Sequence, residues 1–128
     1  MHSQEWLKDL PLKYYFIFFL CLLLYSCHTL SEKRNKEIWS MIKSNNVDSI
    51  VNGTIEIQKA KNTTMLEAIL YKPNDPRITH LAFQKGMSVY QIKMTALKVL
   101  IGISPPNKIT YKVDTSIINF YKQKIKLK

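Results

Sequence analysis

The chain has 128 residues, which suits a single domain with a modest hydrophobic core. It carries 19 Lys and Arg against 9 Asp and Glu, and its whole net charge of +10 lies after Cys27, because the two lysines and two acids before that residue cancel. The only cysteines are Cys21 and Cys27, and the three histidines are scattered. This composition predicts no disulfide framework, no metal site and no cofactor.

The positive charge favours acidic partners such as anionic lipid headgroups, acidic polymers or nucleic acid. Arg34 and Arg77 are the only arginines. Because the arginine fork is the usual reader of bases and phosphates, we do not expect specific nucleic-acid reading. A lysine-rich composition is equally typical of an A/T-rich genome, so the charge alone does not name a partner.

An uncharged apolar run, YYFIFFLCLLLYSC, covers residues 14–27 and follows Lys13. As a helix it would rise about 21 Å, which is short of the roughly 30 Å hydrocarbon core of a bilayer. This length is typical of the apolar region of an export signal. Extending the run to Leu30 reaches the lower edge of the range that spans a membrane.

The end of this run, Leu24-Tyr25-Ser26-Cys27, resembles the lipobox of bacterial lipoproteins. The resemblance implies cleavage before Cys27 and attachment of diacylglycerol to its thiol. Cys27 would then be the first mature residue and the lipid attachment site, and the protein would be a membrane-anchored part of the cell envelope.

Two alternatives remain open for the same segment. The basic residues of the stretch 33–36 would lie on the cytoplasmic side under the positive-inside rule, which favours an uncleaved signal anchor in the inner membrane. An ordinary cleaved signal or a buried helix is the third interpretation. In each case we divide the chain into a signal or anchor segment (1–27), a tether (28–31) and a basic helical domain (32–128).

Helix start and stop signals, rather than strand alternation, punctuate the rest of the chain. The sequence therefore predicts an all-α fold, either a small bundle or a short α-solenoid of about five or six helices after the N-terminal segment. Ser31 is the predicted N-cap of a helix over 32–45, in which Ile38, Met41 and Ile42 share one face.

The segment 47–61 has two interpretations. Asp48 is a candidate N-cap for an amphipathic helix bearing Ile50, Val51, Ile55 and Ile57. Asn52-Gly53 is also a strong hairpin signal between two β-branched runs. We favour the helix, because the neighbouring segments are helical and a lone hairpin is marginally stable.

Four further signals predict the remaining helices. Thr64 begins a capping box whose helix is stopped by Pro73. Asp75 as N-cap and Pro76 at the first position predict a helix that ends at Gly86. Ser88 begins a second capping box, and its helix runs to Ile101 with Gly102 after it. Asp114 caps a last helix whose apolar face contains Ile117, Ile118, Tyr121 and Ile125.

One stretch of about 30 residues resembles a repeat of the HEAT type. The residues that carry this resemblance are Asp75-Pro76-Arg77-Ile78, Gly86, Ala96-Leu97 and Gly102. It implies a pair of short helices that pack on a neighbouring pair. Because nothing else in the chain repeats this pattern and an array usually needs three units, a compact bundle remains the main prediction.

The nearest approach to a polar constellation is Asp75, Arg77 and His80, with Arg77 and His80 on one predicted helix face and Glu67 nearby. We interpret it as structural: Asp75 caps its helix, and Arg77 pairs with Asp75, Glu67 or Asp114. The sequence contains no nucleophile elbow and no glycine-rich phosphate loop. It therefore predicts neither catalysis nor a small-molecule substrate.

The C-terminal tail is basic, and no acid follows Asp114. Near an anionic leaflet each lysine is worth about 1 kcal/mol, which makes the tail a candidate contact with anionic surfaces: Lys122, Lys124, Lys126 and Lys128. The alternative is a frayed, solvated terminus.

These observations lead to two functional hypotheses. The first is a small envelope lipoprotein whose helical domain binds another envelope protein or an acidic polymer and performs no chemistry. The second is a single-pass membrane protein whose basic cytosolic domain contacts anionic lipid or nucleic acid. An enzyme is a third class, which no catalytic spacing supports.

Overall fold

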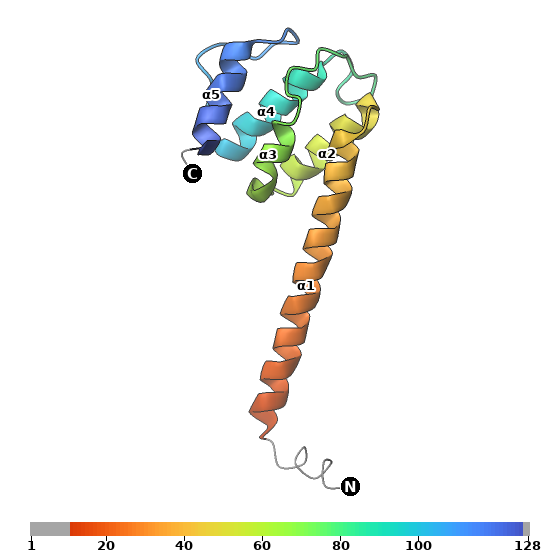
Figure 1. The fold of residues 1–128 in the computed structure, drawn as a ribbon, viewed down its shortest axis with the longest axis vertical. Helices are drawn as coiled ribbons and strands as arrows, with labels where there is room; N and C mark the ends of the chain where they lie inside the picture. Colours follow the sequence, from red (N-terminus) through yellow and green to blue (C-terminus); the bar gives the residue numbers. More distant parts are fainter. Residues whose placement is uncertain (1–10, 127–128) are drawn as a thin grey trace. The chain divides into compact units, whose positions relative to one another are not determined.

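The computed structural model describes residues 11–126, which are predominantly helical (Figure 1). Among these residues, five α-helices and one short 3-10 helix follow in the order α1 (Leu12–Lys43), α2 (Val47–Lys59), η1 (Thr63–Met65), α3 (Leu66–Ile69), α4 (Val89–Ile101) and α5 (Thr115–Lys126). In this part of the chain, one isolated antiparallel β-bridge pairs Ile78 with Ser88. The predicted all-α fold is confirmed.

The chain divides into two compact units, one that ends at Arg34 and one that begins at Asn35. In the first unit, α1 exposes every side chain from Leu12 to Arg34. Ser26 Oγ donates to the carbonyl of Leu22, and Thr29 Oγ1 donates to that of Ser26, so these hydroxyls bond within their own helix.

The prediction of a separate helix start at Ser31 is wrong, because α1 continues through residues 28–31. No Gly or Pro interrupts the sequence between Leu12 and Lys43. His28 Nδ1 and Glu32 Oε1 lie 3.7 Å apart, one turn from each other, across the expected break. Without a breaker, adding one more residue to an existing helix costs less than starting a new one.

The second unit is a helical bundle built around α4, which packs against α2, α3 and α5 (Figure 1). Its main core takes side chains from the end of α1 and from every later helix: Ile38, Ile42, Ile57, Leu66, Ile69, Met94, Leu97, Ile117 and Tyr121. A smaller buried cluster joins α2 to the start of α4: Ile50, Val51, Val89 and Ile92.

The segment 47–61 is a helix, α2, and not a hairpin. Its N-cap is Asn46, whose side chain accepts a hydrogen bond from the Ser49 N–H, rather than the predicted Asp48. Gly53, half of the hairpin signal, is buried in α2 against Met41 and Ile42 of α1. The absence of a side chain there lets the two helices approach closely.

The region 62–87 departs most from the prediction. Asn62, not Thr64, caps η1 by accepting from the Thr64 N–H, and α3 follows directly without a side-chain cap. The helix expected from Asp75 to Gly86 is absent: this segment forms turns, with main-chain hydrogen bonds from Thr79 to Met87 and from Val89 to Arg77. Gly86 has a positive φ of 86°, which suits its place in a turn.

The last two helices begin where predicted, and α4 also ends where predicted. Ser88 Oγ accepts from the Gln91 N–H at the start of α4, and Gly102 follows its end in the left-handed conformation. Asp114 Oδ1 accepts from the Ser116 N–H at the start of α5. The predicted apolar face of α5 is confirmed, because Ile117, Ile118 and Tyr121 are buried.

Candidate functional site

The first candidate is the exposed apolar surface of α1. Thirteen large hydrophobic side chains between Leu12 and Leu30 are exposed to between 45% and 86%. Within the described residues, α1 is the one helix long and apolar enough to cross a membrane or to serve as a signal. Its stretch from Leu12 to Leu30 rises about 28 Å, close to the thickness of a hydrocarbon core.

Cys27 lies on this helix, with a free and exposed thiol. Cys21 lies near the middle of the Leu12–Leu30 stretch and is also free and exposed. Both thiols are therefore accessible on the helix surface, and neither forms a disulfide.

The basic tail is helical through Lys126. Lys122 and Lys126 are exposed one turn apart, whereas Lys124 is half-buried, with Nζ 5.3 Å from the centre of the Phe120 ring. Lysines in the last turn of α5 also complement the negative end of the helix dipole. Lys128 lies outside the described residues.

Arg77 pairs with Asp75, which is one of the three predicted partners. Nε lies 3.0 Å from Oδ1 and Nη2 lies 2.7 Å from Oδ2, so the guanidinium grips the carboxylate with two donors. Arg77 Nη1 also donates to the carbonyl of Asn45, between α1 and α2. Burial alone would raise the pKa of Asp75, but the hydrogen bonds from Arg77 outweigh burial and lower it.

The other parts of the predicted constellation do not assemble. Asp75 is not an N-cap; its carboxylate receives the main-chain N–H and the guanidinium of Arg77 instead. His80 does not share a helix face with Arg77, because this segment is not helical. His80 and Glu67 are both exposed on the surface.

Lys93 is a buried charged residue that the sequence analysis did not single out. It is only 2% exposed, and its Nζ donates to the main-chain carbonyl of Tyr71. Burial lowers the pKa of Lys93 to about 8, with the Asp75 carboxylate opposing this shift and the Arg77 charge adding to it. Its spacing was a usable signal, since it lies four residues after Val89 and four before Leu97, on the buried face of α4.

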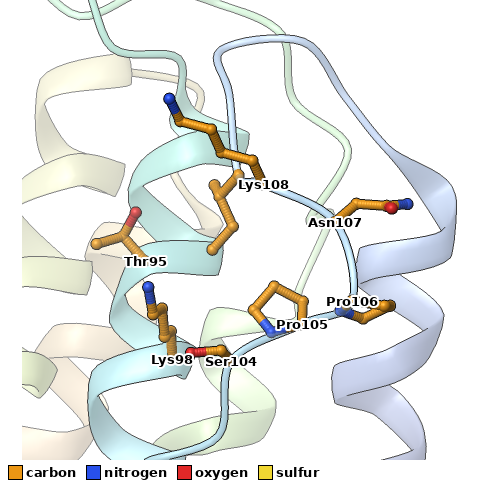
Figure 2. Close-up of a pocket in the computed structure, with 8 residues that line it drawn as sticks. Thr95, Lys98, Ser104, Pro105, Pro106, Asn107 and Lys108 are labelled. Carbon is orange, nitrogen blue, oxygen red and sulfur yellow. The ribbon is translucent and has the colours of Figure 1, made fainter.

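The second candidate is a groove between the C-terminal half of α4 and the loop that follows it (Figure 2). We call it the α4 groove; it has a volume of about 340 Å³ and is lined chiefly by Thr95, Lys98, Ser104, Pro105, Pro106 and Lys108. Figure 2 shows Thr95 and Lys98 projecting from α4, with the two prolines on the loop that passes beside them. The groove combines cationic, hydroxyl and apolar groups.

In the described part of the chain, no three His, Cys, Asp or Glu side chains come together in a way that could hold a metal ion. Comparisons of the chain with protein-family models, with curated proteins and with solved structures found no match. The apolar helix and the basic bundle are thus the two features from which a function can be inferred.

Proposed function

We propose that the protein is a membrane-tethered binding module. In this proposal α1 holds the chain at a membrane, and the basic helical unit after it binds an acidic partner without catalysing a reaction. The single observation that carries the proposal is the exposed apolar surface from Leu12 to Leu30.

The energetics of α1 support a membrane environment. Burying a large apolar side chain is worth about 1.5–3 kcal/mol, so leaving thirteen of them in water would be very unfavourable. Monomeric soluble proteins rarely expose apolar patches of this size. Lipid around α1 would remove the unfavourable exposure, and a helix already satisfies its main-chain groups internally, as a spanning segment must.

The length of α1 favours a single-pass anchor. The Leu12–Leu30 stretch matches a hydrocarbon core in length, and the continuous helix carries Lys33, Arg34 and Lys36 directly after it. Under the positive-inside rule these charges would keep the basic unit in the cytoplasm. Anionic lipid or an acidic protein on that side would then be the natural partner of a +10 chain.

A second candidate rests on the sequence Leu24-Tyr25-Ser26-Cys27, which resembles a lipobox. In that case the chain would begin at Cys27, and acyl chains on its thiol would replace the helical span as the anchor. The basic unit would then lie in the cell envelope. Both candidates share the membrane tether and the non-catalytic binding role.

The test is extraction of membranes that contain the full chain with alkaline carbonate. The wild-type chain should stay in the membrane pellet. Replacing Leu20 and Leu23 by Arg should release it, because each arginine at the centre of a span costs about 2.5–3.5 kcal/mol. The matched control places arginines at Phe83 and Val99, which are exposed in the second unit, and should not release the chain. Wild-type protein in the soluble fraction would disprove the tether.

A further inference from the structure

The α4 groove has unpaired positive charge. Among the described residues, no carboxylate pairs with Lys98 or Lys108, and both side chains are exposed. Lys98 lies in the last turn of α4, where a cation complements the helix dipole, but Lys108 lies on a loop and has no such role. Two free ammonium groups beside the hydroxyls of Thr95 and Ser104 form a surface that suits an anionic group.

Hydrogen bonds to α5 and its N-terminal residues hold the loop that forms the groove at two places. At its start, the Tyr121 hydroxyl donates to the carbonyl of Ile103 at 2.9 Å. Near its middle, Asn107 Nδ2 lies 3.5 Å from Asp114 Oδ2 and 3.4 Å from Ser116 Oγ, at the beginning of α5. These contacts restrict the loop beside the groove, and a restricted loop lowers the entropic cost of binding.

The consecutive prolines decide between two kinds of anion. Phosphate sites commonly use clusters of main-chain N–H groups, and Pro105 and Pro106 have none to offer. Instead the prolines, with Ile109, give the groove an apolar wall. A ligand that fits both parts carries carboxylates and aliphatic side chains together, as an acidic polypeptide segment does.

We propose that the α4 groove binds an extended acidic segment of a partner protein, with its carboxylates at Lys98 and Lys108 and its aliphatic side chains against Pro105 and Ile109. This inference rests on the proposed function, because it names the site and the partner class of the basic unit. It makes the module a protein-docking domain rather than only a charged surface.

The experiment uses the full chain in nanodiscs of zwitterionic lipid, so that the membrane itself carries no net charge. The probe is a fluorescein-labelled hexapeptide of alternating Glu and Leu, and binding is measured by fluorescence anisotropy. The double variant Lys98→Ala/Lys108→Ala should bind about tenfold more weakly, which corresponds to about 1.4 kcal/mol. Lys98→Arg/Lys108→Arg should bind like the wild type, and circular dichroism should show an unchanged fold in both.

The matched control is Lys59→Ala/Lys85→Ala, which removes the same charge from exposed lysines on α2 and on the turn before Gly86. It should bind the peptide within about twofold of the wild type. An equal loss in both double variants would overturn the groove in favour of diffuse electrostatic attraction. Displacement of the peptide by millimolar inorganic phosphate, but not by sodium chloride at the same ionic strength, would overturn it in favour of a phosphate site.

This experiment distinguishes a failure of the membrane tether from a failure of the α4 groove. Co-elution of the chain with the nanodisc reports on the tether, whereas the anisotropy reports on the groove. A chain that stays in the nanodisc but binds no peptide, even at low salt, disproves the groove and leaves the tether standing.

Discussion

Gly53 of α2 faces Ile42 of α1 so closely that a β-carbon at position 53 would lie 3.0 Å from Ile42 Cγ1. The same β-carbon would lie 3.2 Å from the Cβ of Met41. Both distances are shorter than ordinary van der Waals contact, so this one glycine sets how near α2 can approach the end of α1. The contact makes a direct prediction about stability.

Gly53→Ala should destabilise the second unit. Alanine would gain about 1 kcal/mol in helix propensity, but overpacking a core contact costs about 1–3 kcal/mol, so we expect a net loss of about 1 kcal/mol. Gly53→Leu should lose more. Urea unfolding of the full chain in detergent, followed by tryptophan fluorescence, measures the change. Asn52→Ala is the control on the exposed side of α2 and should be neutral or stabilising; a stabilised Gly53→Ala chain would contradict the close contact.

Lys93 should make the second unit more stable as the pH rises from about 8 toward 10. The pKa of Lys93 is about 8 in the folded chain and 10.5 in the unfolded chain, so the unfolded chain binds more protons between these values. Raising the pH in this range therefore increases the free energy of unfolding. Above about pH 10 the buried Tyr121, whose folded pKa is raised to about 12, opposes the trend, because its unfolded form ionises first.

Lys93→Met should flatten this pH dependence, since methionine has a similar volume and no charge. Unfolding free energies at several pH values between 7 and 10 provide the measurement. The exposed Lys98→Met is the matched control on the same helix and should keep the wild-type slope. A wild-type chain whose free energy of unfolding falls between pH 8 and 10 would contradict the lowered pKa of the buried Lys93.

Arg77→Lys should weaken the tie between the 75–77 segment and the loop between α1 and α2. Lysine keeps the charge but loses the two-donor grip on Asp75 and the bond to the Asn45 carbonyl. Because the Arg77 side chain is 42% exposed, solvent screens the ion pair, and we expect a loss of about 1 kcal/mol in unfolding free energy. His80→Ala, an exposed neighbour, should change it by less than about 0.5 kcal/mol. Equal changes in unfolding free energy for Arg77→Lys and His80→Ala would show that the paired hydrogen bonds from Arg77 to Asp75 contribute nothing.

The sequence predicts helix ends well where the signal is local. Ser88, Gly102 and Asp114 all act as predicted, because a cap needs only its own helix. Ser31 fails since the helix around it has no breaker, and Asp75 fails since Arg77 occupies its carboxylate. In both cases the outcome depends on residues other than the predicted cap.

The candidate sites also divide into those that local sequence predicts and those that depend on residues distant in sequence. The apolar run before Leu30 is evident in sequence, because it depends only on the composition of neighbouring residues. The role of Gly53 depends on Ile42, which is distant in sequence, whereas the burial of Lys93 could be inferred from its spacing to Val89 and Leu97 on one face of α4. The α4 groove joins a helix to a loop and depends on contacts with α5, which no local pattern encodes.

The C-terminal lysines should strengthen contact with anionic membranes. We expect a fragment of residues 31–128, once circular dichroism shows that it is helical, to sediment with anionic vesicles at low salt. Replacing Lys122, Lys124, Lys126 and Lys128 by Ala should reduce this binding, and the difference should shrink as salt is added. Replacing Lys59, Lys61, Lys72 and Lys85 by Ala removes the same charge elsewhere. If both sets of substitutions reduce binding equally, the tail has no special role.

The central claim is that α1 lies in a membrane, and its own cysteines test this most directly. If the Leu12–Leu30 stretch spans the bilayer, Cys21 lies near its centre and Cys27 lies about 9 Å from Cys21 along the helix, still within the hydrocarbon core. Intact membranes that contain the wild-type chain are treated with a membrane-impermeant maleimide, and the labelled peptides are read by mass spectrometry. We predict that both thiols are unlabelled in intact membranes and labelled after denaturation in detergent. Labelling of Cys21 in intact membranes would contradict a membrane-embedded α1, and a mature chain that lacks Cys21 and carries lipid on Cys27 would contradict the single-pass anchor.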